Sequence, residues 1–176
     1  MCFHSSRFEA RVNEYGDLVD LEHQNRNKYN QELIKIGEHY LTQSTVMNAT
    51  VSNYQLEAAV SYEHCIAKTF KDTHWQNILI LYDTQLKKQF SPVIELNRVV
   101  PYSRVYGAEK GLKALELVEK SNHFKDTHLY YAIKADLLFE LNQMDLAAKN
   151  YRKAISINKN LLEQKHLTKK LKKTGV

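Results

Sequence analysis

The chain has 176 residues, of which 43% are hydrophobic, and a formal net charge of +5. Five glycines and two prolines argue against a turn-rich β fold, and the two cysteines, Cys2 and Cys65, provide neither a disulfide framework nor a spaced pair of metal ligands. A signal peptide is not evident and no apolar run approaches the ~18 residues of a membrane helix, so the sequence predicts a cytoplasmic protein without a membrane partner.

The net charge is concentrated near the end of the sequence. Residues 159–176 contain six lysines and one glutamate, which accounts for the whole excess of positive charge. The preceding residues are therefore neutral in sum. This distribution predicts a basic final helix rather than a basic face across the fold, and it predicts that the chain does not bind specific DNA sequences.

The first fifty residues have mixed signals. Residues 2–10 indicate the end of a helix already under way, so we expect Met1 to be an internal methionine. Residues 11–22 alternate apolar and polar positions around Gly16, which predicts either a short β-hairpin or a loop wrapped on the helices. A helix is then expected from Asn27 or Asn30 to Thr42, with an apolar stripe of Leu33, Ile36, Tyr40 and Leu41. We expect residues 1–50 to pack on helical repeats formed by residues 51–176.

Helical periodicity then recurs in pairs. Residues 53–68, where Tyr54, Ala58 and Ser61 follow a large-small-small order, and residues 73–88 predict a first helical hairpin. A second hairpin starts at Ser91-Pro92, and Pro101 should kink or end its first helix.

The clearest hairpin covers residues 128–159. Asn142 suits the left-handed turn between its two helices, and Asp145 can cap the second helix. Small and large residues alternate along the facing stripes, which are Tyr131, Ala135 and Leu138 on one helix and Ala147, Tyr151 and Ala154 on the other. This order is similar to a tetratricopeptide repeat, a unit of about 34 residues.

The second hairpin is a degenerate copy of this unit. Its corresponding residues lie 35 positions earlier in the first helix and 33 positions earlier in the second, namely Leu96, Val100, Ala114, Val118 and Ser121. A charged last helix over residues 159–173 is typical of the end of a helical solenoid. The predicted fold is all-α, with about eight or nine helices in tetratricopeptide-like hairpins and at most a short N-terminal β-hairpin.

Sequence motifs for catalysis or cofactor binding are lacking. The nearest approach to a metal-ligating cluster is His64-Cys65 with His74. Adjacent residues on a helix point about 100° apart and rarely bind one ion together, so surface and boundary histidines are the preferred interpretation. We therefore expect no cofactor and no metal. An enzyme with a metal or acid–base site in the repeat groove is a third, disfavoured hypothesis.

A few residues qualify as structural or interaction sites. Trp75 and Tyr82 lie seven positions apart on one helical face, which suits either a peptide platform or, preferably, the core. Asp83, Asn97 and Arg98 are polar residues within apolar helical segments, so they need partners if buried. A contact from Asp83 to Arg98 between adjacent helices would serve binding or act as a structural clamp.

An ordered set of short stretches carries a family resemblance over nearly the whole chain. It comprises Gly16-Asp17-Leu18-Val19, Gln24-Asn25-Arg26, Tyr54 to Ala59, Trp75, Ile78, Leu81-Tyr82-Asp83, Ser91-Pro92-Val93, Leu96-Asn97-Arg98, Ala135-Asp136-Leu137-Leu138 and Tyr151-Arg152-Lys153-Ala154. In this the chain resembles the C-terminal tetratricopeptide-like extension of extracytoplasmic-function sigma factors, which belong to the sigma-70 family of bacterial RNA polymerase sigma factors. It departs from their pattern at His23, Asn25 and His74, where acidic residues are usual nearby.

The resemblance implies a regulatory, protein-interaction region that acts in transcription initiation and is not an enzyme. The implied partners are the promoter-reading regions of the sigma factor in cis, which this chain lacks, the RNA polymerase core, and a protein regulator. Asp136 and Tyr151 join the candidate interaction residues through the matching stretches. The alternative hypothesis is a free-standing tetratricopeptide scaffold with an unrelated partner.

Overall fold

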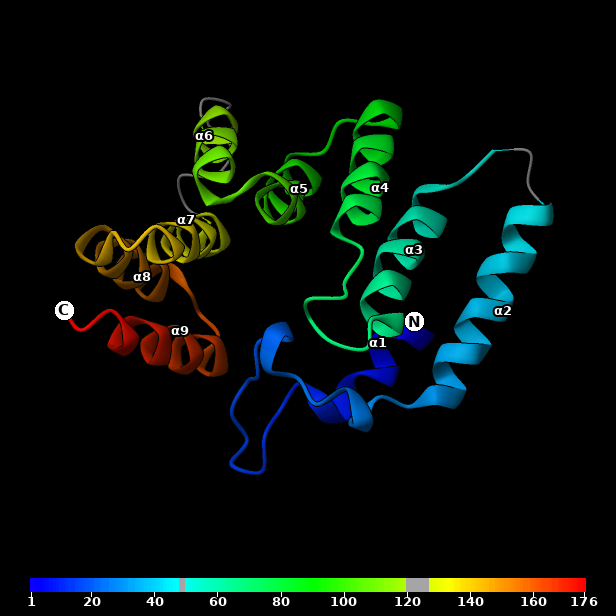
Figure 1. The fold of residues 1–176 in the computed structure, drawn as a ribbon, viewed down its shortest axis with the longest axis horizontal. Coiled ribbons are helices and arrows are strands. Elements are labelled where there is room, and N and C mark those ends of the chain that lie inside the picture. The colour runs from blue at the N-terminus through cyan, green and yellow to red at the C-terminus, as the bar shows by residue number, and fades with distance from the viewer. Residues whose placement is uncertain (48–49, 120–126) are drawn as a thin grey trace. The chain divides into compact units, whose positions relative to one another are not determined.

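The computed structural model describes residues 1–47, 50–119 and 127–176 (Figure 1). Across these residues the regular secondary structure consists of helices, which confirms the all-α prediction. The helices belong to two compact units, Met1–Gln89 and Phe90–Val176. The boundary that we expected at residue 50, between the N-terminal segment and the helical repeats, lies inside the first unit.

The described residues of the first unit form four α-helices. They are α1 (Cys2–Ser6), α2 (Gln31–Met47), α3 (Asn53–Ile66) and α4 (Trp75–Lys88). Helix α1 packs against both α2 and α3, and α3 packs against α4 as the predicted first hairpin. Three short 3-10 helices lie between α1 and α2, at Phe8–Ala10, Leu21–His23 and Arg26–Lys28.

Residues 11–22, which were expected to form a β-hairpin or a loop, contain one antiparallel bridge. It joins Val12 to Leu18, while Asn13 accepts hydrogen bonds on its side chain from the backbone of Tyr15 and Asp17. Gly16 has a φ of 76°, which a side chain would strain. The segment is therefore a tight bend closed by a single bridge.

Side-chain caps fix the starts of α2 and α3. The Asn30 side chain accepts from the backbone N–H of Leu33, so α2 begins after Asn30 and continues to Met47, beyond the predicted end at Thr42. Ser52 and Gln55 form a reciprocal capping box at the start of α3. The cap of α3 is thus one residue earlier than the expected Asn53.

The buried stripe of α2 differs from the prediction. Ile36 and Tyr40 are 46% and 64% exposed, whereas Ile34 and Gly37 are buried. Gly37 explains the rotation, because a Cβ there would lie 2.7 Å from Cε1 of Phe3. The close approach of Phe3 selects the Gly37 face for burial and turns Tyr40 outward.

The second unit contains α5 (Pro92–Tyr106), α6 (Ala108–Glu119), α7 (His128–Glu140), α8 (Met144–Ile157) and α9 (Leu161–Lys173). Helices α5 and α6 pair, α7 and α8 pair, and α9 packs on α8. Pro101 is buried inside α5, so of the two outcomes predicted for it, a kink or an end, the end of the helix is wrong. The turn comes at Gly107, the predicted centre of the turn in this hairpin, with a φ of 93°.

The last hairpin has the predicted repeat packing. Ala135, Ala147 and Ala154 are fully buried where α7 and α8 meet, and Tyr151 is 2% exposed in the same cluster. Asn142 has the expected left-handed backbone, with a φ of 58°. Asp145 lies in the first turn of α8 and not at its cap, because α8 already begins at Met144.

The second hairpin shares this packing in part. Leu96 and Val118 are buried in one apolar cluster, and Val100 packs against it. Ala114 is partly buried. The remaining predicted position, Ser121, lies outside the described residues.

Candidate interaction groove

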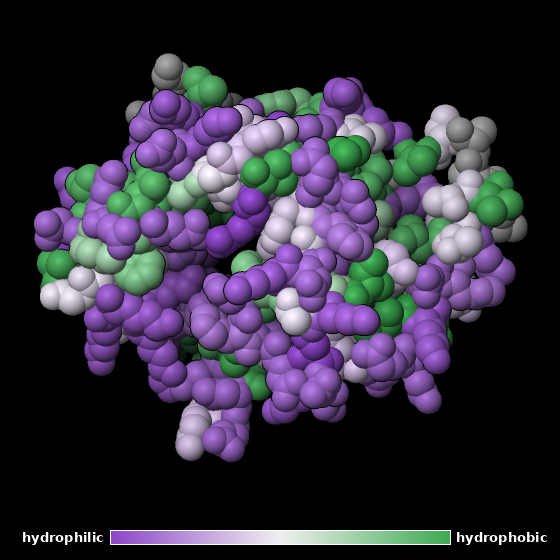
Figure 2. Space-filling view, in the orientation of Figure 1, coloured by the Kyte–Doolittle hydropathy of each residue, from purple (hydrophilic) through white to green (hydrophobic). Residues whose placement is uncertain are grey.

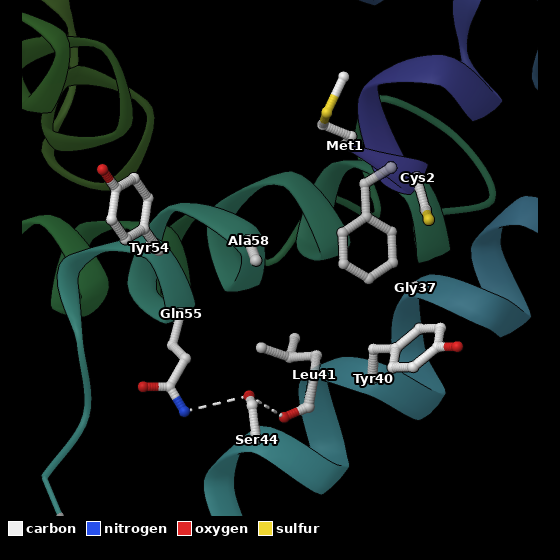
Figure 3. Close-up of a pocket in the computed structure, with 10 residues that line it drawn as sticks. Met1, Cys2, Gly37, Tyr40, Leu41, Ser44, Tyr54, Gln55 and Ala58 are labelled. Carbon is white, nitrogen blue, oxygen red and sulfur yellow. Dashed lines mark hydrogen bonds between the residues drawn. The ribbon is translucent and has the colours of Figure 1, made fainter. Parts of the chain in front are cut away.

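A groove of about 240 Å³ lies among α1, α2 and α3 of the first unit (Figure 3). We call it the N-terminal groove. Helix α2 contributes Gly37, Tyr40, Leu41 and Ser44, helix α3 contributes Tyr54, Gln55 and Ala58, and the start of the chain contributes Met1, Cys2 and Phe3. Phe3 occupies the space beside Gly37, and the small side chain of Ala58 lines the groove.

Two exposed tyrosines flank the groove. Tyr40 on α2 is 64% exposed and Tyr54 on α3 is 83% exposed. Figure 2 shows hydrophobic residues on this face over α2 and α3, among hydrophilic ones. Tyrosine combines a large apolar ring with a hydroxyl group and is enriched in protein interfaces. The rim of the groove therefore has the composition of a protein-binding surface.

Two polar side chains in the groove, Ser44 and Gln55, are hydrogen-bonded within the protein. Gln55 donates from Nε2 to Oγ of Ser44 at 3.0 Å, and Ser44 donates to the carbonyl of Leu41 at 2.7 Å (Figure 3). The Oε1 atom of Gln55 accepts from the backbone N–H of Ser52. Because these polar groups are engaged, the groove offers mainly apolar contact, which suits association better than acid–base chemistry.

A second hollow of about 360 Å³ shares Tyr54, Met1, Phe3 and Ala58 with the groove. It also contains His4, whose Nε2 lies 3.2 Å from Oγ of Ser61 and whose Nδ1 lies 3.1 Å from Nη2 of Arg11. Burial lowers the pKa of His4, and the positive charge of Arg11 lowers it further. A neutral His4 therefore accepts from Arg11 at Nδ1 and donates to Ser61 from Nε2.

A hydrogen-bond network around Arg26 connects the segment before α2 to α3. Its Nη1 donates to Oη of Tyr29 at 2.5 Å and to the carbonyl of His64 at 2.9 Å. Tyr29 in turn donates to Oε1 of Gln24. Burial, with Arg7 and Arg26 nearby, lowers the pKa of His64 to about 4. His64 is therefore neutral near pH 7, and its uncharged ring packs between α3 and Trp75.

The predicted aromatic pair on α4 is partly buried. The Trp75 ring meets the rings of His64 and Phe70 edge-on, with centroids 5.6 and 5.3 Å away. Tyr82 is also partly buried, and burial raises the pKa of its hydroxyl, with the negative charge of Glu57 adding to the effect. These contacts support the packing interpretation of Trp75 over that of an open peptide platform.

The predicted polar residues of α4 and α5 are partly buried as well. Asp83 lies in the first unit, whereas Asn97 and Arg98 lie in the second. The Arg98 guanidinium stacks on the Tyr102 ring, 5.1 Å from its centroid. The contact between Asp83 and Arg98 stays a prediction.

Two candidate residues of the last hairpin come together. Tyr151 on α8 donates from Oη to Oδ1 of Asp136 on α7 at 2.6 Å. Lys170 on α9 donates to both carboxylate oxygens of Asp136, at 3.1 and 3.0 Å. The sequence singled out the first two residues and missed Lys170, for which its place in a lysine-rich helix gave no specific signal.

The histidines and cysteine weighed as metal ligands have separate partners. His64 packs against Trp75, Cys65 lies 3.4 Å from the carbonyl of Phe3, and His74 lies 2.9 Å from Glu63. Burial raises the pKa of the Cys65 thiol. Over residues 1–47, 50–119 and 127–176, no three His, Cys, Asp or Glu side chains gather as they would around a metal ion. In the same ranges no helix has the length and apolar character needed to span a bilayer.

Comparison with known proteins gives a partial match. Residues 1–45 match a family of unknown function, DUF6596, and so include the α1 and α2 sides of the N-terminal groove. The chain is 29% identical over 167 residues to an uncharacterized protein of Rhizobium meliloti (strain 1021). That match covers 94% of this chain and 38% of the relative, so the chain spans well under half of the relative's length. No solved structure matches the chain significantly.

Proposed function

We propose that this chain is the regulatory, protein-interaction region of an extracytoplasmic-function sigma factor and acts in transcription initiation. The ordered sequence resemblance points to this class, and the paired helices agree with a tetratricopeptide-like extension. The relative from Rhizobium meliloti is much longer than the matched part, which leaves room for further regions in a protein of this type.

The observation that carries the proposal is the N-terminal groove with its exposed tyrosines. Tyr40 and Tyr54 flank a hollow in which the polar side chains of Ser44 and Gln55 are already hydrogen-bonded. Such a surface gains free energy by covering its apolar area, and aromatic residues at an interface commonly contribute most of the affinity. The proposed occupant is a helix of the promoter-reading regions carried by the same polypeptide, with RNA polymerase as the further partner of the assembled sigma factor.

The first test is genetic. Coding sequence for two sigma-type helical regions in frame upstream of Met1 supports the proposal. A stop codon and a ribosome-binding site immediately before Met1 contradict it, and would favour the alternative of a free-standing tetratricopeptide scaffold.

The second test measures binding. The upstream regions, purified separately, should bind this chain in calorimetric titration, and Tyr54→Ala should weaken that binding by about tenfold. Tyr15→Ala is the matched control, because Tyr15 is 78% exposed but lies on the bend away from the groove. Equal binding of both variants would show that the groove is not the contact surface.

A further inference from the structure

Helix α8 presents three cations on one side. Arg152 and Lys153 lie three and four residues after Lys149. The three side chains therefore occupy neighbouring positions on one helical face. All three side chains are exposed. Together with Tyr131 of α7 and the polar residues Asn150 and Ser156, they line a pocket of about 500 Å³. We call it the α8 basic pocket.

The pocket has no acidic side chain among its lining residues. Several carboxylates of the second unit instead form ion pairs with other cations: Asp136 with Lys170, Glu140 with Arg104, and Glu119 with Lys134. Lys153 lies over the Tyr131 ring, 5.9 Å from its centroid, and Arg152 donates to a terminal oxygen of Val176, the last residue, at 3.3 Å. Within the described residues, these ion pairs do not involve Lys149, Arg152 or Lys153, and the lining of the pocket has a net positive charge.

We propose that the α8 basic pocket binds a short acidic segment of a partner protein. Carboxylates of the segment pair with Lys149, Arg152 and Lys153, and an apolar residue beside them packs on the exposed part of Tyr131. Charge complementarity of this kind gives an interface its specificity and raises its association rate. The proposal rests on charges of the second unit alone, so it stands whether or not the chain is part of a sigma factor.

The short length of the charged patch along α8 favours a peptide over a nucleic acid as the ligand. Lys149 and Lys153 are four residues apart, so they span about 6 Å along the helix axis at about 1.5 Å per residue. An extended peptide advances about 3.3 Å per residue, so two or three acidic residues match that span. Duplex binding instead draws its affinity from many phosphates along a longer track. Three cations beside one aromatic ring fit the shorter ligand.

The test uses the full chain and a fluorescein-labelled peptide rich in glutamate with one central phenylalanine. Fluorescence anisotropy at about 0.1 M salt, where the Debye length is near 10 Å, should show binding of this peptide and little binding of its glutamine-substituted copy. The double variant K149E/K153E should lose about tenfold or more in affinity, because it reverses two of the three charges. The control K172E/K173E changes the same charge on exposed positions of α9 and should lose less than about twofold.

Three results would overturn the proposal. Equal losses in the two double variants would mean that the peptide responds only to net charge. Equal binding of the glutamine copy would mean that carboxylates are not recognised. Tighter binding of a labelled duplex DNA, lost in K149E/K153E, would assign the pocket to nucleic acid. If K149E/K153E does not fold by circular dichroism, K149Q/K153Q takes its place, with K172Q/K173Q as its control.

Discussion

Tyr151 is buried to 2% exposure, yet its hydroxyl reaches Oδ1 of Asp136 at 2.6 Å. The ring belongs to the apolar cluster between α7 and α8, while the hydroxyl ends at a carboxylate that Lys170 of α9 also holds. One side chain therefore contributes both to the core of the repeat and to the polar contact that joins three helices.

We expect Tyr151→Phe to lower the free energy of unfolding by about 1–2 kcal/mol, since it deletes a hydrogen bond to a charged acceptor and preserves the ring. Urea denaturation followed by circular dichroism measures the change. Tyr15→Phe, on the exposed bend, is the control and should leave stability unaltered. The same midpoint for all three proteins would show that the bond to Asp136 adds no net stability.

Ala147→Leu and Ala154→Leu should each destabilise the fold by ~1–3 kcal/mol, because both alanines are fully buried between helices and added methylenes must push them apart. Thermal unfolding of the two variants checks this. Neither substitution should alter a binding activity of the folded fraction. Melting temperatures equal to that of the parent chain would be incompatible with the observed register of α7 against α8.

The last hairpin was predictable because its local and tertiary requirements agree. Alanines at Ala135, Ala147 and Ala154 indicate close helix contact, and Asn142 indicates a left-handed turn, so a single sequence already specifies the packing. For Pro101 the sequence predicted either a kink or an end, and it could not decide between them, because tertiary packing holds the helix where the isolated backbone would favour a break.

The N-terminal groove was harder to predict. Tyr40 fits the apolar stripe of α2 by periodicity, and Tyr54 fits the repeat order of α3, so both were expected to pack inward. Which face is buried depends on the partner helix, and here Phe3 needs the space beside Gly37. The glycine was the available signal, but its meaning required knowing that α1 packs against α2.

The stability of the protein should fall in weakly acidic solution through His64. Burial, with the positive charges of Arg7 and Arg26, lowers its folded-state pKa to about 4, against about 6.5 in the unfolded chain. Between these values the unfolded state binds a proton that the folded state does not, so the free energy of unfolding decreases as pH falls from about 6.5 toward 4. The contribution is fully present above about pH 6.5.

His64→Gln isolates this effect from the titration of the carboxylates. The free energy of unfolding is measured in urea at pH 7 and at pH 4.5. Its decrease between these pH values should be smaller in the variant than in the parent chain by roughly 2 kcal/mol. His23→Gln is the control, because His23 is exposed on the segment before Arg26. If the His64 and His23 variants have the same pH dependence, the folded state does not disfavour the protonated form of His64.

The final prediction concerns duplex DNA. The excess positive charge of the sequence lies in α9 and the residues around it, and one of its lysines, Lys170, is already bonded to Asp136. We expect weak binding without preference between a promoter duplex and its scrambled copy, with an affinity that falls steeply as salt rises.

The variant for this test changes Lys169, Lys172 and Lys173 to glutamine and keeps Lys170, so that the contact with Asp136 is preserved. Anisotropy titrations at near-physiological salt should show similar, reduced binding of both duplexes to the variant. Tight binding that selects the promoter and survives the three changes would locate a DNA-reading surface in the helical repeats, and the interaction-region proposal would then have to be abandoned.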